Sequence, residues 1–218
     1  MFSFFGEFID LLAQALKFLN GIVGNYGLAI ITFTLLIKFA LLPLTLKQTR
    51  SMKDMQKIQP EMKKIQKEYE DDKEKQQQEM MKLYQEHGVN PAAGCLPMIL
   101  QLVILIPLYR SILSLQGVMG EANFLWIGTL TGGSLAQPDV ALVIINALAM
   151  GVQTYITQKI NGGEGQGSKM MYIMPAFLLF VGLQLPSGLL LYWLTSTIFT
   201  GVQQYIVGRE SEVKEAAE

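Results

Sequence analysis

The chain has 218 residues, of which 50% are hydrophobic and 16% are charged, and its mean hydropathy is +0.31. An ordinary soluble domain carries about 25% charged residues, so this composition favours a protein embedded in a lipid bilayer. Ten of the 17 basic residues and nine of the 18 acidic residues lie between positions 47 and 86, and a run balanced in this way is not a surface that binds nucleic acid.

The residues on which common catalytic and metal sites depend are scarce. Cys95 is the single cysteine and His87 the single histidine, so an internal disulfide, a thiolate metal cluster and a two-histidine metal site are all excluded. The sequence also contains no GxSxG, P-loop or GxGxxG motif. We therefore expect a protein that is not an enzyme and that binds no cofactor or metal.

Residues 1–25 are predicted to form an amphipathic helix that lies on the outer surface of the membrane. Apolar residues such as Leu12 and Leu16 recur at helical spacing, with charged and amide residues between them. A signal peptide is the alternative interpretation. Signal peptides begin with a basic region, whereas the first charged residues here are Glu7 and Asp10.

Five apolar segments follow, and each is predicted to cross the membrane as a helix, which takes about 20 residues. The turn-forming sequence Leu-Pro-Ser-Gly at 185–188 divides the longest apolar stretch into two helices. The predicted fold class is thus an all-α integral membrane protein with five transmembrane helices. These helices cover residues 26–46, 94–116, 138–158, 170–185 and 187–207, and the external loop 117–137, the cytoplasmic loop 159–169 and the short acidic tail 208–218 complete this part of the chain.

Residues 47–92 are predicted to form a helical hairpin in the cytoplasm. Apolar side chains recur at helical spacing on both sides of the charged run 70–75. Packing between the two arms is the favoured interpretation, and a solvated stalk or an adaptable, methionine-rich peptide-binding surface are the alternatives. The apolar seam of this hairpin consists of Met52, Met55, Met62, Ile65, Met80 and Leu83.

Orientation follows from the distribution of basic residues. Fourteen of the 17 lysines and arginines fall in the hairpin, in or beside the loop 159–169, and in the tail. Because basic residues accumulate on the cytoplasmic side of membrane proteins, we expect the N-terminus outside and the C-terminus inside. The exceptions are Lys17, Lys38 and Arg110.

Lys38 is the residue least expected in its surroundings. It lies nine residues before Lys47, which places it about 13 Å from the cytoplasmic border of the first transmembrane helix. A lysine near the bilayer centre costs about 2.5–3.5 kcal/mol on insertion scales. The one acid in these segments is Asp139, at the outer edge of 138–158, so water in a polar cavity is the predicted partner. A cationic cavity suits the acidic tail of a nascent membrane protein, or an anion.

Several motifs, in the same order along the chain, resemble those of the YidC/Oxa1/Alb3 membrane protein insertases, in particular the short Gram-positive type. They are MKDMQKIQPE at 52–61, LYQEHGVNP at 83–91, GCLPMILQ at 94–101, and PSGLLLYW at 186–193 followed by Gln203 and Gln204. The resemblance covers residues 20–208. It implies a five-helix core around a hydrophilic groove that opens to the cytoplasm and to lipid. It also implies an activity that needs neither ATP nor a cofactor.

The resemblance also implies roles for individual residues. Lys38 occupies the position of a basic residue, usually arginine, that attracts the hydrophilic part of a substrate, and lysine lacks the bidentate geometry of arginine. The other predicted groove residues are Gln153, Trp193, Thr34, Gln101 and Ser196. A sliding surface for the apolar part of the substrate is predicted at Leu142, Ile145, Leu148, Leu190, Leu194 and Ile198.

The function expected from these features is insertion of single-spanning and small membrane proteins into the bacterial plasma membrane. The expected partners are nascent membrane proteins and lipids, with the Sec translocon and the ribosome as further candidates. Two other functions use the same features. A small transporter or anion channel would use Lys38 in a path open to both faces, and a scaffold subunit would act through the hairpin.

Overall fold

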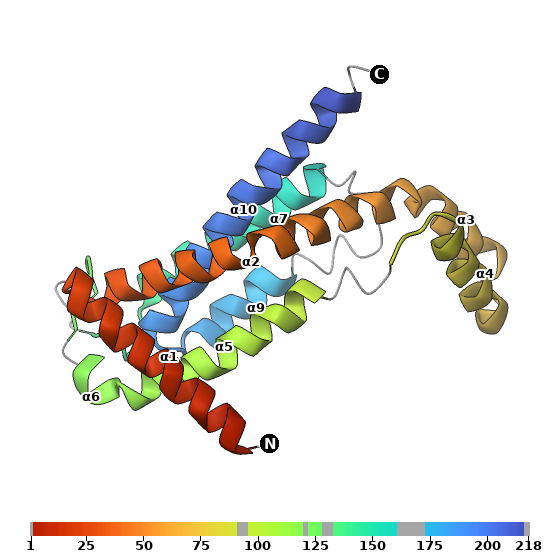
Figure 1. The fold of residues 1–218 in the computed structure, drawn as a ribbon. Helices are drawn as coiled ribbons and strands as arrows, with labels where there is room; N and C mark the ends of the chain where they lie inside the picture. The colour runs from red at the N-terminus through yellow and green to blue at the C-terminus, as the bar shows by residue number, and fades with distance from the viewer. Residues whose placement is uncertain (1, 91–95, 120–121, 128–132, 161–172, 216–218) are drawn as a thin grey trace.

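The computed structural model describes residues 2–90, 96–119, 122–127, 133–160 and 173–215, and most of these are helical (Figure 1). The predicted all-α class is confirmed for this part of the chain, whereas Cys95 and most of the predicted loop 159–169 lie outside it. The helices are α1 (Phe2–Val23), α2 (Tyr26–Lys57), α3 (Gln59–Glu68), α4 (Lys73–Glu86), α5 (Leu96–Ser114), α6 (Gln116–Met119), α7 (Val140–Ile160), α9 (Ile173–Gly182) and α10 (Ser187–Glu215).

Two of the described helices are long and apolar enough to cross a membrane, namely Tyr26–Met55 within α2 and Val140–Gln158 within α7. The apolar stretch Ile99–Ser114 of α5 is shorter, and α9 has only 10 residues. α10 has 29 residues, but hydroxyl and amide side chains interrupt its apolar sequence. The count of five crossings and their orientation therefore stay predictions.

α2 extends well beyond the predicted first transmembrane segment. The sequence predicts that segment to end at residue 46, whereas the helix continues without a break to Lys57. It ends there because Pro60, in the first turn of α3, has no N–H to continue the hydrogen-bonding pattern. The first part of the predicted hairpin thus belongs to the same helix as Lys38. Only α3 and α4 fold back on each other, and Figure 1 shows them standing away from the other helices.

An apolar core fills the end of the bundle that is remote from α3 and α4. Side chains from five helices meet there, because α1 packs on α2 and α5 while α10 packs on α2 and α7. Close packing of this kind is what holds helices together in a membrane, where lipid is as apolar as the side chains themselves. The fully buried residues of this core include Leu16, Ile30, Leu108, Ile112, Leu142, Leu190 and Tyr192.

The segment that precedes α7 closes this end of the bundle. The ring of Phe124 packs directly on Gly27 of α2, where an added Cβ would lie 2.2 Å from Cγ of the ring. The backbone N–H of Gly188, at the start of α10, donates to the carbonyl of Leu135 at 2.8 Å. The segment is therefore fixed to both α2 and α10, and glycine is required at 27 because the ring occupies the place of a side chain.

Replacement of Gly27 by alanine is expected to lower the stability of the folded protein by about 1–3 kcal/mol, because the added methyl group overlaps the ring of Phe124. Thermal unfolding in detergent, followed by circular dichroism, measures the effect. Gly151→Ala in α7 is the matched control, since no atom lies within 4 Å of its added Cβ and alanine favours the helix. Equal midpoints for the two variants would contradict the packing described here.

Candidate functional site

Lys38 contacts α10 from the middle of the apolar part of α2. Its side chain is half-buried, and its Nζ donates a hydrogen bond to Oγ1 of Thr200 at 3.1 Å. An aromatic pair lies beside this contact, because Phe39, which follows Lys38, meets Phe199, which precedes Thr200, edge to face with ring centroids 5.2 Å apart. In the described part of the chain, the partner of this ammonium group is therefore a neutral hydroxyl.

Two further polar contacts join α2 to α10 in the direction of α3. Oγ1 of Thr45 lies 3.1 Å from Oε1 of Gln203, and Nζ of Lys53 donates to the backbone carbonyl of Val207 at 3.1 Å. The residue number rises along both helices from one contact to the next, so the two helices run in parallel. Polar groups follow this interface as far as the root of the hairpin.

α7 adds polar groups to the same region. Oγ1 of Thr157 donates to Oε1 of Gln204 at 2.7 Å, and the side chain of Gln153 lies against Gly201, with its Cγ 3.8 Å from where a Cβ would stand. We use the name polar seam for the set of side chains that these three helices contribute, namely Lys38, Thr45, Gln153, Thr157, Ser196, Thr200, Gln203 and Gln204.

Hydrogen bonds between side chains of α2, α7 and α10 are thus concentrated in one half of the bundle. The apolar core occupies the half of α2, α7 and α10 that begins at Tyr26, Val140 and Ser187, whereas the polar seam occupies the half nearer to the hairpin. A buried polar group is costly without a hydrogen-bond partner. When such groups lie on three facing helices, they can form hydrogen bonds with one another. At this end of the bundle the three helices are joined through polar side chains.

The predicted groove residues do not all lie in the polar seam. Lys38, Gln153 and Ser196 belong to it, and Trp193 is half-buried one turn before Ser196. Gln101 lies on α5, where its side chain and that of Ser196 are next to the hydroxyl of Tyr192. That hydroxyl is buried but makes no hydrogen bond of standard geometry in the described part of the chain.

Three predicted site residues have almost no exposed surface in this structure. Thr34 is 0% exposed, and its hydroxyl donates to the carbonyl of Ile30 in its own helix at 2.7 Å. Leu142 and Leu190 are 1% and 0% exposed, because both face the apolar core between α7 and α10. Of the other predicted slide residues, Ile145, Leu148 and Ile198 are exposed and Leu194 is half-buried.

The hairpin has a small apolar core of its own. Ile58, Leu83 and Val89 are buried together, and the predicted residues Met55, Met62 and Ile65 pack against them. Met52 and Met80 are half-buried outside this cluster. The two arms therefore pack on each other, around a buried isoleucine at the joint of α2 and α3 that the sequence analysis did not include.

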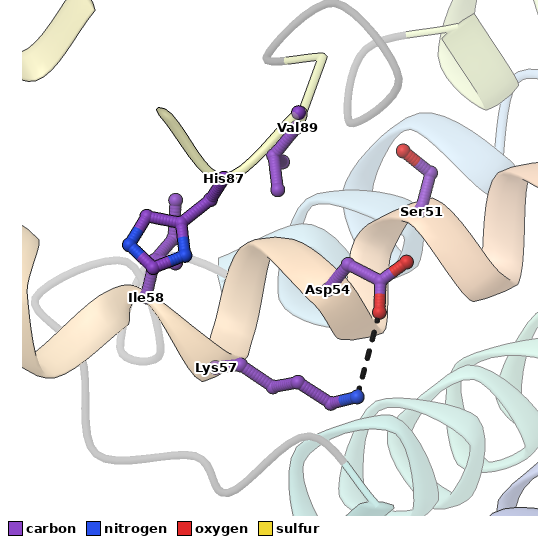
Figure 2. A pocket seen from close by; sticks show the side chains of 7 residues that line it. Ser51, Asp54, Lys57, Ile58, His87 and Val89 are labelled. Atoms are coloured by element: carbon purple, nitrogen blue, oxygen red, sulfur yellow. Dashed lines mark ion pairs between the residues drawn. The ribbon is translucent and has the colours of Figure 1, made fainter. Parts of the chain in front are cut away.

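A pocket lies beside this joint, where the end of α2 meets the chain that leaves α4 (Figure 2). An ion pair joins Nζ of Lys57 to Oδ1 of Asp54 at 3.6 Å, and Nε2 of His87 lies 3.5 Å from Oε2 of Glu61. No group of three or more side chains suited to a metal ion occurs among the described residues. The pocket is lined by Ser51, Asp54, Lys57, Ile58, His87, Gly88 and Val89.

Two important polar residues were missed by sequence reasoning. Thr200, the partner of Lys38, follows Ser196 by four residues and precedes Gln204 by four, so helical spacing alone could have placed it on the same face. Asp139 is 3% exposed and caps α7, where its Oδ1 accepts from the N–H of Leu142 at 2.7 Å. It lies at the opposite end of the bundle from the polar seam.

Apolar helices of membrane-spanning length, with a lysine held between them among hydroxyl and amide groups, are typical of an integral membrane protein. The sequence model of the family described as 60Kd inner membrane protein matches residues 18–215. The chain belongs to this family of bacterial membrane proteins, which includes the YidC insertases.

Several relatives align with most of this chain. The chain is 42% identical over 204 residues to the "Membrane protein insertase YidC" of Fusobacterium nucleatum, covering 91% of this chain and 95% of the relative. It is 38% identical over 206 residues to "Membrane protein insertase YidC 2" of Bacillus anthracis, covering 92% and 79%. With the YidC of Geobacter sulfurreducens the identity is 39% over 207 residues, covering 94% of this chain and 38% of the relative.

A solved structure has the same fold. The "Active YidC insertase crystal structure with the first transmembrane domain resolved" matches with a TM-score of 0.74 and 31% identity, over 90% of this chain and 45% of that one. The present chain therefore spans nearly the whole of the Fusobacterium relative but less than half of the solved protein and of the Geobacter relative.

Replacement of Leu83 by alanine is expected to loosen the hairpin, because it removes a buried side chain from a cluster of only three. A loss of about 2 kcal/mol or more would accelerate amide hydrogen exchange in α4 by about 30-fold or more where local opening controls exchange. Met81→Ala is the control, since Met81 is 52% exposed on the same helix. Equal exchange rates in both variants would show that the two arms are not held by this cluster.

Proposed function

We propose that this protein inserts membrane proteins into the bilayer and that the polar seam lines a hydrophilic groove that receives the polar part of a substrate. The observation that carries the proposal is the position of Lys38, half-buried between apolar helices and bonded to a hydroxyl. A neutral partner leaves the positive charge uncompensated, so the ammonium group retains its attraction for an acidic group. The name insertase, which the relatives carry, supports the same function.

The proposed topology has five crossings, with the N-terminus outside and the C-terminus inside. α1 fits an interfacial position because it has three different sides. Leu12 and Leu16 are buried against the bundle, Leu11 and Phe18 are exposed apolar residues, and Lys17 lies on the exposed polar side. A helix at the boundary of water, lipid and protein requires these three surfaces.

Insertion would proceed without ATP or a cofactor. An acidic tail that enters from the cytoplasm is drawn to Lys38, and the apolar segment that follows it passes into lipid. Burial of that segment in lipid releases about 25 cal/mol for each Å² removed from water. The membrane potential adds about 2.3 kcal/mol per negative charge per 100 mV when the charge moves outward. Exposed apolar residues of α7 and α10, such as Ile145, Leu148 and Ile198, provide the proposed sliding surface.

The proposed partners are nascent membrane proteins and the surrounding lipids. α3 and α4 stand away from the rest of the molecule (Figure 1), so the hairpin is the part best placed to reach the Sec translocon or a ribosome. Lysine in place of arginine at the groove position would preserve charge attraction while losing the planar, bidentate contact with a carboxylate. The groove would then select for charge more than for geometry.

Lys38→Glu is expected to abolish insertion of a single-spanning substrate with an acidic tail, because repulsion replaces attraction, whereas Lys38→Arg should remain active. The protein is reconstituted into otherwise protein-free liposomes, and protection of the translocated tail from protease is measured. Lys17→Glu is the matched control, because it makes the same charge reversal on the exposed face of α1.

A second substrate, with its acidic residues replaced by amides, separates charge attraction from other effects. It should depend much less on the residue at position 38. Equal activity of Lys38→Glu and the unaltered protein on the acidic substrate would refute the proposed role of Lys38. Flux of a small anion through the same liposomes would instead indicate a channel.

A further inference from the structure

We propose that Thr200 is a positioning residue that holds the ammonium group of Lys38 inside the polar seam. The two residues are 162 positions apart in the chain and meet at a distance of 3.1 Å between Nζ and Oγ1. The effect of this contact on insertion rests on the proposed function. Its effect on the position of Lys38 does not.

The hydroxyl of Thr200 is oriented as an acceptor. A hydroxyl has one proton to donate and two lone pairs that accept. Here the proton is donated to the carbonyl of Ser196, four residues back in the same helix, at 2.8 Å. The lone pairs are therefore free to face α2, where Lys38 supplies a donor. The bond within α10 thus fixes the direction in which Thr200 receives the lysine.

The neighbours of Thr200 on α10 keep it in place. Phe199 meets Phe39 of α2, and Gly201 is buried against Gln153 of α7. Three consecutive residues of α10 are therefore in contact with the two neighbouring helices. Because Phe39 is also the residue after Lys38, the aromatic pair holds the two helices in the register that the hydrogen bond requires.

Lys38 needs such a contact to stay at this depth. A lysine side chain within a membrane helix extends toward the nearest aqueous border when nothing retains it, and its flexible stem costs little to bend. A carboxylate in place of Thr200 would retain the lysine but would cancel its charge. A hydroxyl retains it while leaving the charge intact, and two of the three N–H groups stay available for an incoming acidic group.

Chemical labelling tests the positioning directly. Thr200→Val keeps the shape of the side chain and removes the acceptor, so Lys38 should react severalfold faster with a water-soluble amine-acylating reagent added from the cytoplasmic side. Mass spectrometry of the Lys38 peptide gives the rate. Thr200→Ser should restore the slow rate. Thr195→Val is the matched control, because Thr195 makes the same bond to the carbonyl four residues back, at 2.8 Å to Leu191.

Insertion assays then test the consequence. Thr200→Val should reduce insertion of the acidic substrate about tenfold, as expected for loss of one hydrogen bond to a charged group, and Thr200→Ser should recover it. In a Lys38→Met background, Thr200→Val should have no further effect. Equal losses in both backgrounds, with unfolding midpoints unchanged, would overturn the link between Thr200 and Lys38.

The labelling and insertion experiments test separate claims, so either claim can be refuted without the other. Labelling of Lys38 that is the same in Thr200→Val and in the unaltered protein would refute the positioning role, whatever the insertion assay gives. Labelling that rises only in Thr200→Val supports the positioning role even if Lys38→Glu inserts substrate normally. In that case the proposed use of the lysine in insertion is the part that fails.

Discussion

The ammonium group of Lys38 is the constraint around which the three central helices are arranged. A lysine in an otherwise apolar helix costs about 2.5–3.5 kcal/mol near the middle of a bilayer, so neighbouring helices must offer it polar atoms. α10 does so with Thr200, and the other polar residues on that face of α10 meet α2 and α7. The same face of α10 therefore meets both the charge on α2 and the polar side chains of α7.

The opposite end of the bundle is built on a different principle. It contains side chains that fit closely, and its buried polar side chains, such as Ser111 and Asn146, bond to backbone carbonyls. The segment before α7 covers it through the contact of Phe124 with Gly27. Asp139 lies there too, but it caps a helix and accepts from the indole N–H of Trp126 at 3.2 Å. The bundle therefore has its side-chain hydrogen bonds between α2, α7 and α10 at one end and its apolar core at the other.

The continuity of α2 joins the hairpin to this interior. Because α2 runs from Tyr26 to Lys57 with Pro43 inside it, Lys38 and the root of the hairpin are on the same helix. Lys53, one turn before that root, bonds to the backbone of α10.

The sequence by itself determined the all-helical membrane class, the anomaly of Lys38, the helical hairpin and the family, because composition, periodicity and motifs are local properties. It did not determine which helix faces which. The sequence predicts that Leu142 and Leu190 face lipid, whereas in the structure they are buried between α7 and α10. It predicts Thr34 in the groove, whereas the hydroxyl of Thr34 bonds within its own helix. Periodicity defines the apolar side of a helix but gives neither its rotation nor its neighbours. The partner of Lys38 depends on both, and so only the packing of α10 against α2 identified Thr200.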